Sequence, residues 1–283
     1  MTTLIIGGSG FLGAELIRQA TAAGDSTAAT YATEPGDTAY AKWWHLDLTE
    51  AGRLDEVMAE VEPRLVINVA SSKANWGVTA QGPLRIAMAT AQTGSRLMHV
   101  SSDAVFSGGR VHYDEHCLPD PVTPYGAAKA AAETGVLTLY PQAVVARTSL
   151  IIGHGRSVHE RVVHELAAGT RQGSLFTDDV RCPVYVEDLA AALLELAASD
   201  AAGVRHLAGA DAVSRHELGT LIARRDGLDV SQLRTGLRAH SALPGALDVR
   251  LDSCATQKTM RTVLRGAKEF CAVPPSSRSA PST

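Results

Sequence analysis

A glycine-rich turn near the start of the chain constrains the fold more than any other feature. Thr2–Ile6 is a short apolar run with β-branched residues, typical of a buried parallel strand. The run leads into GGSGFLG at residues 7–13, and Phe11–Ala23 then shows helical spacing up to Gly24, a predicted C′ glycine. Only glycine permits such a tight turn and a close backbone approach to a pyrophosphate. The segment therefore predicts a dinucleotide-binding unit, with contacts from Gly7, Ser9, Gly10, Phe11, Leu12 and Gly13.

Strands and helices are expected to alternate along the first half of the chain. The further predicted strands are Ser26–Tyr31, Trp43–Leu46, Arg64–Ala70, Arg96–Ser101 and Gln142–Thr148. The predicted helices between them are Glu50–Glu60, Pro83–Thr93 and Tyr125–Leu139. Alternation of this kind predicts an α/β fold, a doubly wound parallel Rossmann sheet.

After Ser149 the alternation loosens, and a small C-terminal substrate lobe is expected. The later predicted elements are helices Ser157–Ala168, Glu187–Ala198 and Ser214–Arg225, and strand Arg181–Val186. Ser214 is the predicted N-cap of its helix, with Glu217 as capping-box partner. We assign residues 1–150 to the dinucleotide-binding domain, with 181–200 returning to it, and 151–180 and 201–271 to the lobe. The Pro- and Ser-rich segment 272–283 is predicted to be a disordered tail.

Composition excludes several classes of protein. A net charge of −4 does not suggest binding to nucleic acid. No apolar run approaches the roughly 18 residues that a membrane-spanning helix needs. The four cysteines are scattered without a CxxC pair, so neither a metal site nor a disulfide framework is expected. The N-terminus enters a strand without an export signal, which predicts a cytoplasmic protein.

Three residues form a candidate catalytic set. Tyr125 and Lys129 stand four residues apart on one predicted helix, so they share a face. A neighbouring cation favours the phenolate, and Lys129 is therefore expected to bring the pKa of Tyr125 closer to neutrality. Ser102 follows a buried strand at the predicted ligand edge, where its hydroxyl could donate to a substrate carbonyl. Tyr125 would then transfer the proton.

The end of the second strand bears on the choice of cofactor. An acid there favours NAD, whereas a basic residue favours NADP. Tyr31 occupies this region, with no acid at the strand end and no basic residue before Lys42, so NADP(H) is favoured and NAD(H) is possible. Asp47, followed by Leu48, either accepts a hydrogen bond from the adenine amino group or caps the next helix.

These motifs resemble the extended short-chain dehydrogenases/reductases, and among them the dTDP-4-dehydrorhamnose reductases and related sugar-nucleotide-binding proteins. The matching segments are 7–13, 47–48, 68–70, 100–106, 124–129, 147–149 and 182–190. The resemblance implies hydride transfer from a nicotinamide to C4 of a nucleotide-linked 4-keto-6-deoxy sugar or a related polar ketone. It implies Tyr125 as general acid, Lys129 as its tuner and ribose anchor, and Ser102 as the group that orients the carbonyl. It also implies cofactor contacts at Val69, Ala70 and Ser71.

Two departures from this family limit the substrate prediction. The run SSKANW at residues 71–76, which is expected to border nicotinamide and sugar, replaces the family's small and acidic residues. The family also usually has an Asn and a Gly at the start of the next helix, where this chain has QGP at residues 81–83. A dehydratase is disfavoured, because the 4,6-dehydratases need an Asp-Glu pair and Asp103 is followed here by Ala104.

Further side chains are candidates for substrate binding, each with a plainer alternative. Trp76 would border the sugar, and Asp103 would bind a sugar hydroxyl or cap a turn. His154 and Arg156, with His159 and Arg161, would bind a diphosphate or begin a solvated helix. Arg181 would reach a phosphate or pair with Asp178 or Asp179 at the surface.

Two other functions stay open. One is an NAD-dependent sugar-nucleotide epimerase or dehydrogenase. The other is a non-catalytic subunit that binds dinucleotide to regulate a partner enzyme. A homodimer is possible in each case, and the expected partner is a small molecule, with no nucleic acid or membrane.

Overall fold

The computed structural model describes residues 2–37, 39–50, 52–242 and 244–272. A seven-stranded sheet with order β12-β7-β5-β4-β1-β2-β3 forms its centre, and all neighbouring strands are parallel. Its strands are β1 (Thr2–Ile6), β2 (Ser26–Tyr31), β3 (Lys42–His45), β4 (Leu65–Asn68), β5 (Arg96–Ser102), β7 (Val144–Thr148) and β12 (Gly203–Leu207). The predicted doubly wound parallel sheet is confirmed.

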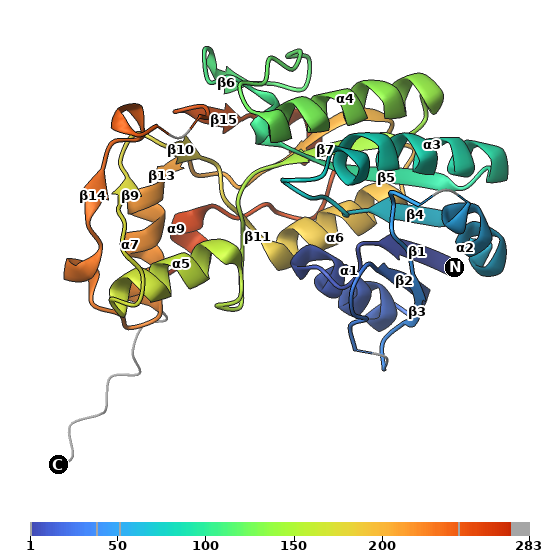
Figure 1. Ribbon diagram of the computed structural model, residues 1–283, viewed down its shortest axis with the longest axis horizontal. Helices are drawn as coiled ribbons and strands as arrows, with labels where there is room; N and C mark the ends of the chain where they lie inside the picture. The colour runs from blue at the N-terminus through green and yellow to red at the C-terminus, as the bar shows by residue number, and fades with distance from the viewer. Residues whose placement is uncertain (1, 38, 51, 243, 273–283) are drawn as a thin grey trace.

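Helices cover both faces of this sheet (Figure 1). One face carries α1 (Phe11–Ala22) and α6 (Val186–Ala197), and the other carries α2 (Arg53–Val61), α3 (Gly82–Thr93) and α4 (Pro124–Leu139). Alternate residues of β1 serve the two layers, because successive strand side chains point to opposite faces: Ile5 packs with α1 and α6, and Leu4 packs with α2 and α3.

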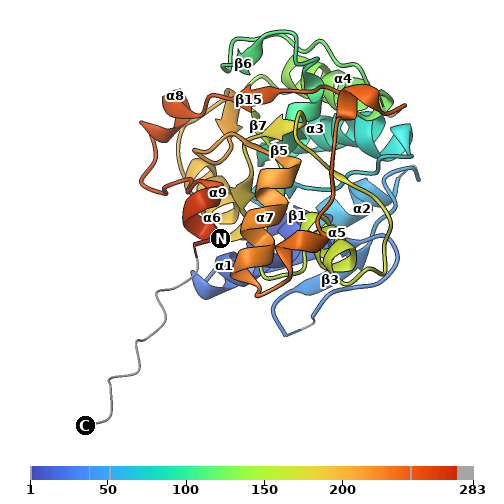
Figure 2. The same ribbon diagram turned by 90° about the vertical axis from the view of Figure 1, so that its left-hand side faces the viewer.

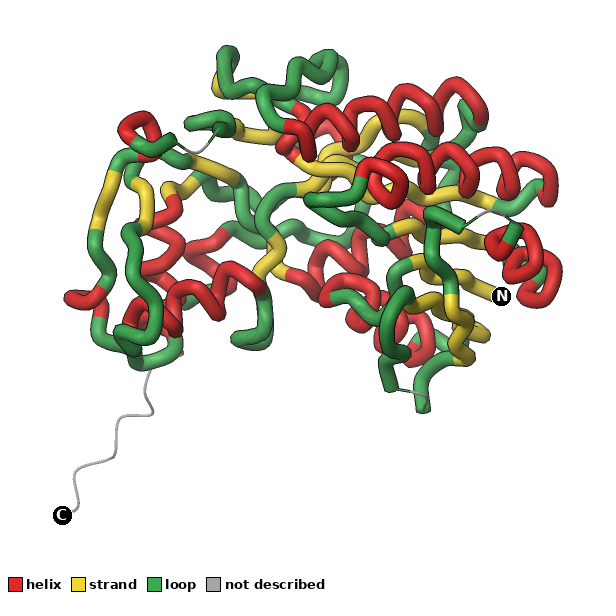
Figure 3. Tube along the Cα trace, in the orientation of Figure 1, coloured by secondary structure: helices red, strands yellow, loops and turns green. Residues whose placement is uncertain are grey.

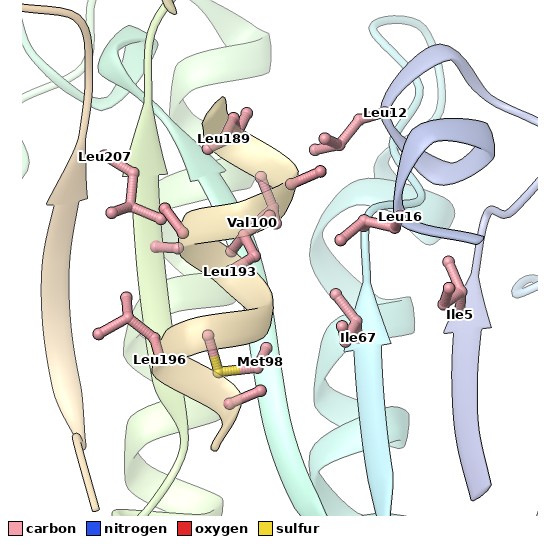
Figure 4. Close-up of a cluster of buried hydrophobic side chains, with 14 of the residues drawn as sticks. Ile5, Leu12, Leu16, Ile67, Met98, Val100, Leu189, Leu193, Leu196 and Leu207 are labelled. Atoms are coloured by element: carbon pink, nitrogen blue, oxygen red, sulfur yellow. The ribbon is translucent and has the colours of Figure 1, made fainter. Parts of the chain in front are cut away.

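The prediction that residues 181–200 return to the Rossmann core is supported by α6. Figure 4 shows Leu189, Leu193 and Leu196 of this helix against Met98 and Val100 of β5. All five side chains are buried, so α6 covers the part of this sheet face that α1 does not cover. Burying a leucine side chain contributes about 2 kcal/mol, which makes this segment integral to the core.

The boundary of the lobe differs from the prediction at one strand. Residues 201–271 were expected in the lobe, but β12 pairs with β7 from Gly203 to Leu207 and extends the main sheet. Its sequence, GVRHL, is too short and too polar to predict a sheet strand without knowing its neighbour. We therefore propose that the dinucleotide-binding part ends near residue 207 rather than residue 200.

The lobe lies beyond the carboxyl ends of the strands (Figures 1 and 3). Its helices are α5 (Val158–Ala167), α7 (Arg215–Arg225), α8 (Cys254–Gln257) and α9 (Ala267–Phe270). Short strand pairs complete it: β8 (Ile151–Ile152) with β11 (Val184–Tyr185), β9 (Leu175–Phe176) with β14 (Thr235–Gly236), β10 (Val180–Arg181) with β13 (Val213–Ser214), and β6 (Val111–Tyr113) with β15 (Val249–Leu251). The predicted strand Arg181–Val186 is thus split between β10 and β11.

Capping residues explain where the lobe helices begin. Ser157 caps α5, and its hydroxyl oxygen accepts from the backbone N–H of Glu160. The Glu160 carboxylate in turn accepts from the backbone N–H of Ser157, which completes a capping box. Ser214 caps α7 as predicted, by accepting from the backbone N–H of Glu217. Figure 2 views the molecule from the lobe side, with α7 toward the viewer.

Two remaining points concern the rest of the chain. Of the predicted tail, 272–283, residues 273–283 lie outside the described residues. Within the described ranges, no helix combines the length and apolarity that crossing a membrane requires.

Candidate active site

The glycine turn forms an open cradle at the N-terminus of α1. A Cβ at Gly7 would lie 2.8 Å from the backbone nitrogen of Ala70, and one at Gly13 would lie 2.4 Å from the carbonyl oxygen of Gly7. Both positions therefore require glycine. Gly10 precedes the helix without a side-chain cap, and Ser9 and Gly10 are exposed. The free N–H groups of the first helical turn suit an anion, so the residues present fit the pyrophosphate of a dinucleotide.

The far side of this cradle is the predicted adenosine end. Tyr31 ends β2 and makes edge contacts with Trp43 and His45 of β3. Asp47 accepts hydrogen bonds from the backbone and hydroxyl of Thr49, which lower the pKa of its carboxyl group. Asp47 thus closes a turn with Thr49 and does not cap the next helix, α2, whose N-cap is Gly52. The adenine contact stays a prediction. Leu48 is buried beside α3.

A cavity of about 830 Å³ separates the carboxyl ends of the strands from the lobe. Ser102 and Tyr125 both line it, together with Phe11 of the glycine turn. Ser102 is the last residue of β5, and Tyr125 stands in the first turn of α4, which Thr123 caps by accepting from the backbone N–H of Gly126. The structure thus brings the serine and the tyrosine together at the ligand edge.

Tyr125 is held in its protonated form. Burial raises the pKa of the phenol above its usual value of 10, and the Asp103 carboxylate raises it further, whereas hydrogen bonds with Ser71 and Ser102 lower it. The prediction that Lys129 shifts the pKa of Tyr125 toward neutrality is wrong for this structure, because burial has the largest effect on the phenol. The ammonium of Lys129 donates to the backbone carbonyl of Val100 instead.

Lys129 lies beneath the tyrosine, fully buried in α4. Its ammonium donates to the backbone carbonyl of Val100 at 2.9 Å. Burial lowers the pKa of Lys129 to about 8, although Glu133, one turn further along α4, raises it. The lysine therefore sits close to a protonation equilibrium near neutral pH.

A buried ion pair supports this part of α4. Glu133 makes a two-point contact with Arg147 of β7, with a closest N–O distance of 2.8 Å and both side chains about 3% exposed. Glu133 also accepts from the hydroxyl of Ser101. This network joins β5, α4 and β7 next to the elements that carry Ser102 and Tyr125.

A chain of acidic and basic side chains leads from Ser102 into the lobe. Ser102 donates to Asp103 at 3.1 Å, and Arg181 lies between Asp103 and Asp179, at 3.6 and 2.9 Å. Asp179 also pairs with Arg215 and Arg238, at 3.3 and 2.9 Å. Three guanidinium groups thus share two carboxylates, which leaves one positive charge in excess.

Other basic side chains line the same cavity. They are Lys73, Arg156 and Arg161, and His159 lies among them. Burial lowers the pKa of His159 to about 3, and Arg215, whose guanidinium lies 3.3 Å from its Nδ1, lowers it too. The imidazole is therefore neutral and accepts from Arg215. Together these cations favour a substrate with an anionic group.

Two predicted substrate contacts lie away from this cavity. Trp76 is half exposed and is not among the cavity-lining residues. His154 faces Glu15 of α1 and Glu187 of α6 instead, at 3.9 and 3.6 Å. A left-handed backbone at His154 (φ 58°) turns its side chain toward these carboxylates. Both predictions placed the residue from its position in sequence, which does not report the direction of a loop side chain.

Arg181 pairs with Asp179, as its plainer alternative predicted, but it is buried and not at the surface. Its guanidinium also donates to the backbone carbonyls of Val180, Leu247 and Ala246. Arg181 lines the cavity, so the phosphate contact stays a prediction. Sequence reasoning missed Arg215, Arg238 and Ser149, all of which line the cavity. Arg215 carries a weak signal, since it directly follows the predicted N-cap Ser214. Ser149 lies in the segment 147–149, which matches the family pattern, and Arg238 carries no signal.

The fold and this arrangement define an NAD(P)-dependent oxidoreductase of the extended short-chain dehydrogenase type. A family model described as the RmlD substrate binding domain matches residues 1–264, and the chain belongs to that family.

Relatives and solved structures agree with this assignment. A dTDP-4-dehydrorhamnose reductase of Mycobacterium tuberculosis is 31% identical over 249 residues, covering 82% of this chain and 77% of the relative. The methionine adenosyltransferase 2 subunit beta of Xenopus tropicalis is 25% identical over 209 residues, covering 67% and 63%.

Two solved structures share the fold over almost the whole chain. The crystal structure of a hypothetical dTDP-4-dehydrorhamnose reductase from Sulfolobus tokodaii superimposes with a TM-score of 0.82 at 27% identity, covering 94% of this chain and 97% of that one. The dTDP-4-dehydrorhamnose reductase of Bacillus anthracis, solved in complex with NADP, gives 0.80 at 21% identity, covering 95% and 96%.

Proposed function

We propose that this protein is an NADPH-dependent reductase that converts the C4 ketone of a nucleotide-linked 4-keto-6-deoxy sugar to an alcohol. One observation carries the proposal. A half-buried phenol, Tyr125, whose raised pKa keeps it protonated, and a serine hydroxyl, Ser102, face one cavity beside the open glycine cradle. When bound, the reduced nicotinamide supplies the hydride.

In this proposal, residues of the chain bind the cofactor, orient the substrate carbonyl and transfer the proton. The glycine turn and the first turn of α1 bind the pyrophosphate of the cofactor, and Val69, Ala70 and Ser71 border its nicotinamide. Ser102 orients the carbonyl, and Tyr125 gives its proton to the carbonyl oxygen as hydride arrives. Lys129 supports the phenol from below and anchors the nicotinamide ribose. Arg156 and Arg215 bind the diphosphate of the sugar nucleotide.

NADPH is the preferred cofactor in this proposal, and NADH is possible. The end of β2 carries no acid that would repel a 2′-phosphate, and the structurally similar reductase of Bacillus anthracis was solved with NADP. A cytoplasmic location and a homodimer also belong to the proposal, and light scattering of the purified protein tests the dimer.

The test is direct. Purified protein mixed with NADPH and dTDP-4-dehydrorhamnose should consume the absorbance of the reduced nicotinamide. No consumption with several 4-keto nucleotide sugars would reject the reductase. Tightly held NAD in the purified protein would instead favour the epimerase.

A second candidate function rests on the Xenopus relative, whose name is that of a subunit of another enzyme. In that case the chain would bind dinucleotide and regulate a partner. The two functions separate in cells: Tyr125→Phe abolishes the biological role of a reductase and leaves that of a regulatory subunit intact.

A further inference from the structure

Ser102 has a hydrogen-bond partner that conflicts with its proposed role. Its hydroxyl donates to Oδ1 of Asp103 at 3.1 Å, and its oxygen accepts from the backbone N–H of Ala104 at 3.2 Å. A serine has a single hydroxyl proton. To donate to a substrate carbonyl, Ser102 must therefore release Asp103, and Oδ1 then loses this donor.

Losing a donor is costly at this place. Asp103 is 6% exposed, and a buried carboxylate oxygen without a donor has lost its hydration without a hydrogen bond to replace it. Its other oxygen, Oδ2, stays occupied by the hydroxyl of Ser149 at 2.7 Å and by the guanidinium of Arg181 at 3.6 Å. The binding of a ketone thus leaves one specific oxygen atom in need of a hydrogen bond.

Arg181 offers no ready replacement for the donor that Asp103 Oδ1 loses. Both terminal nitrogens of that guanidinium already donate to backbone carbonyls, at 2.7 to 3.0 Å, which holds it in place. Asp103 itself lines the cavity, so a group of the substrate can reach it. The replacement donor must then come from the substrate or from a water molecule.

The geometry of a hydroxyketone matches this requirement. The ketone oxygen and the hydroxyl oxygen on the next carbon lie about one hydrogen-bond length apart, as do Ser102 Oγ and Asp103 Oδ1. Ser102 can then donate to the ketone while the neighbouring hydroxyl donates to Asp103. We propose that Asp103 makes the site selective for ketones that carry a hydroxyl on the adjacent carbon. The inference rests on the proposed reductase function and names the substrate feature it selects.

Two ketones test this selectivity. They are dTDP-4-dehydrorhamnose and its 3-deoxy analogue, which differ only in the hydroxyl next to the ketone. Their kcat/KM values are measured by NADPH oxidation with the unaltered protein and with Asp103→Asn. The unaltered protein should prefer the hydroxylated ketone by roughly 10- to 100-fold, as expected for a hydrogen bond to a charged group. In Asp103→Asn this preference should fall to a few-fold.

A matched control is Asp229→Asn. Asp229 also accepts from a serine hydroxyl, that of Ser231 at 2.7 Å, but it caps a short helical turn (Val230–Gln232) outside the cavity. This variant should keep the full preference.

The outcomes are distinct. Equal kcat/KM for both ketones in the unaltered protein would overturn the inference and leave the reductase standing, even if Asp103→Asn fails to fold. An equal loss on both ketones in Asp103→Asn would assign Asp103 a structural role and overturn the inference as well. Oxidation of NADPH by neither ketone would overturn the proposed function together with the inference.

Discussion

The ammonium of Lys129 donates to the backbone carbonyl of Val100, two residues before the serine that shares the cavity with Tyr125. The lysine thus ties the helix that carries the phenol to the strand that carries the serine. Because α4 and β5 are far apart in sequence, this contact fixes the distance between the two hydroxyls. The ammonium of Lys129 therefore holds α4 against β5, in addition to its proposed role beside Tyr125.

Replacing Tyr125 with phenylalanine should remove the proton donor and little else. We expect kcat/KM for a 4-keto nucleotide sugar to fall by roughly 10²- to 10⁴-fold, while NADPH binding changes little. Tyr40→Phe, at a half-exposed tyrosine outside the cavity, is the matched control. Steady-state NADPH oxidation measures the first quantity and cofactor fluorescence the second. A variant with unaltered turnover would exclude the phenol as the acid.

Lys129 should make the free energy of unfolding depend on pH. Its pKa falls from 10.5 to about 8 on folding, so the unfolded chain binds more protons between these values. The free energy of unfolding therefore rises between about pH 8 and pH 10.5, by up to roughly 3 kcal/mol, because the folded protein no longer buries a charged lysine.

Lys129→Met isolates that effect. Urea unfolding at pH 7 and pH 10 should show the unaltered protein gaining stability relative to this variant at the higher pH. Lys268→Met, at an exposed lysine, should show no such change. A difference between protein and Lys129→Met that is independent of pH would mean that the lysine keeps its charge throughout.

Glu133→Gln should destabilise the fold strongly. It leaves the Arg147 guanidinium charged and without its partner in the core, which costs about 3–5 kcal/mol. Glu56→Gln breaks the exposed pair with Arg53 and should change the free energy of unfolding little, because solvent screens exposed charges. Thermal and urea unfolding compare the two variants. Similar losses in both would show that solvent reaches the Glu133–Arg147 pair.

Gly13→Ala should weaken cofactor binding. The added methyl group would lie 2.4 Å from the carbonyl oxygen of Gly7, so the turn must move away from the helix that receives the pyrophosphate. We expect the affinity for NADPH to fall at least roughly tenfold, the equivalent of 1.4 kcal/mol. Gly109→Ala, whose Cβ would meet only a serine side chain, is the control. Titration of NADPH fluorescence measures both, and equal affinities would show that the turn tolerates a side chain.

Local sequence patterns are sufficient to predict the fold class and to place Ser102, Tyr125 and Lys129 within it. The strand of Thr2–Ile6, the glycine turn and the order of serine, tyrosine and lysine are local patterns. Hydrophobic periodicity and glycine geometry act over a few residues, so they are visible without a partner. The capping serine at 214 was predictable for the same reason.

Which side chains meet depends on contacts between segments that are distant in the sequence. The tertiary structure turned His154 toward Glu15 and Glu187 and buried the ammonium of Lys129 against Val100. It also gathered Arg215 and Arg238 around Asp179. Each of these contacts joins segments far apart in the chain, and the direction of a loop side chain depends on packing that no local pattern encodes. The pKa of a group follows its burial, which is likewise a property of the whole fold.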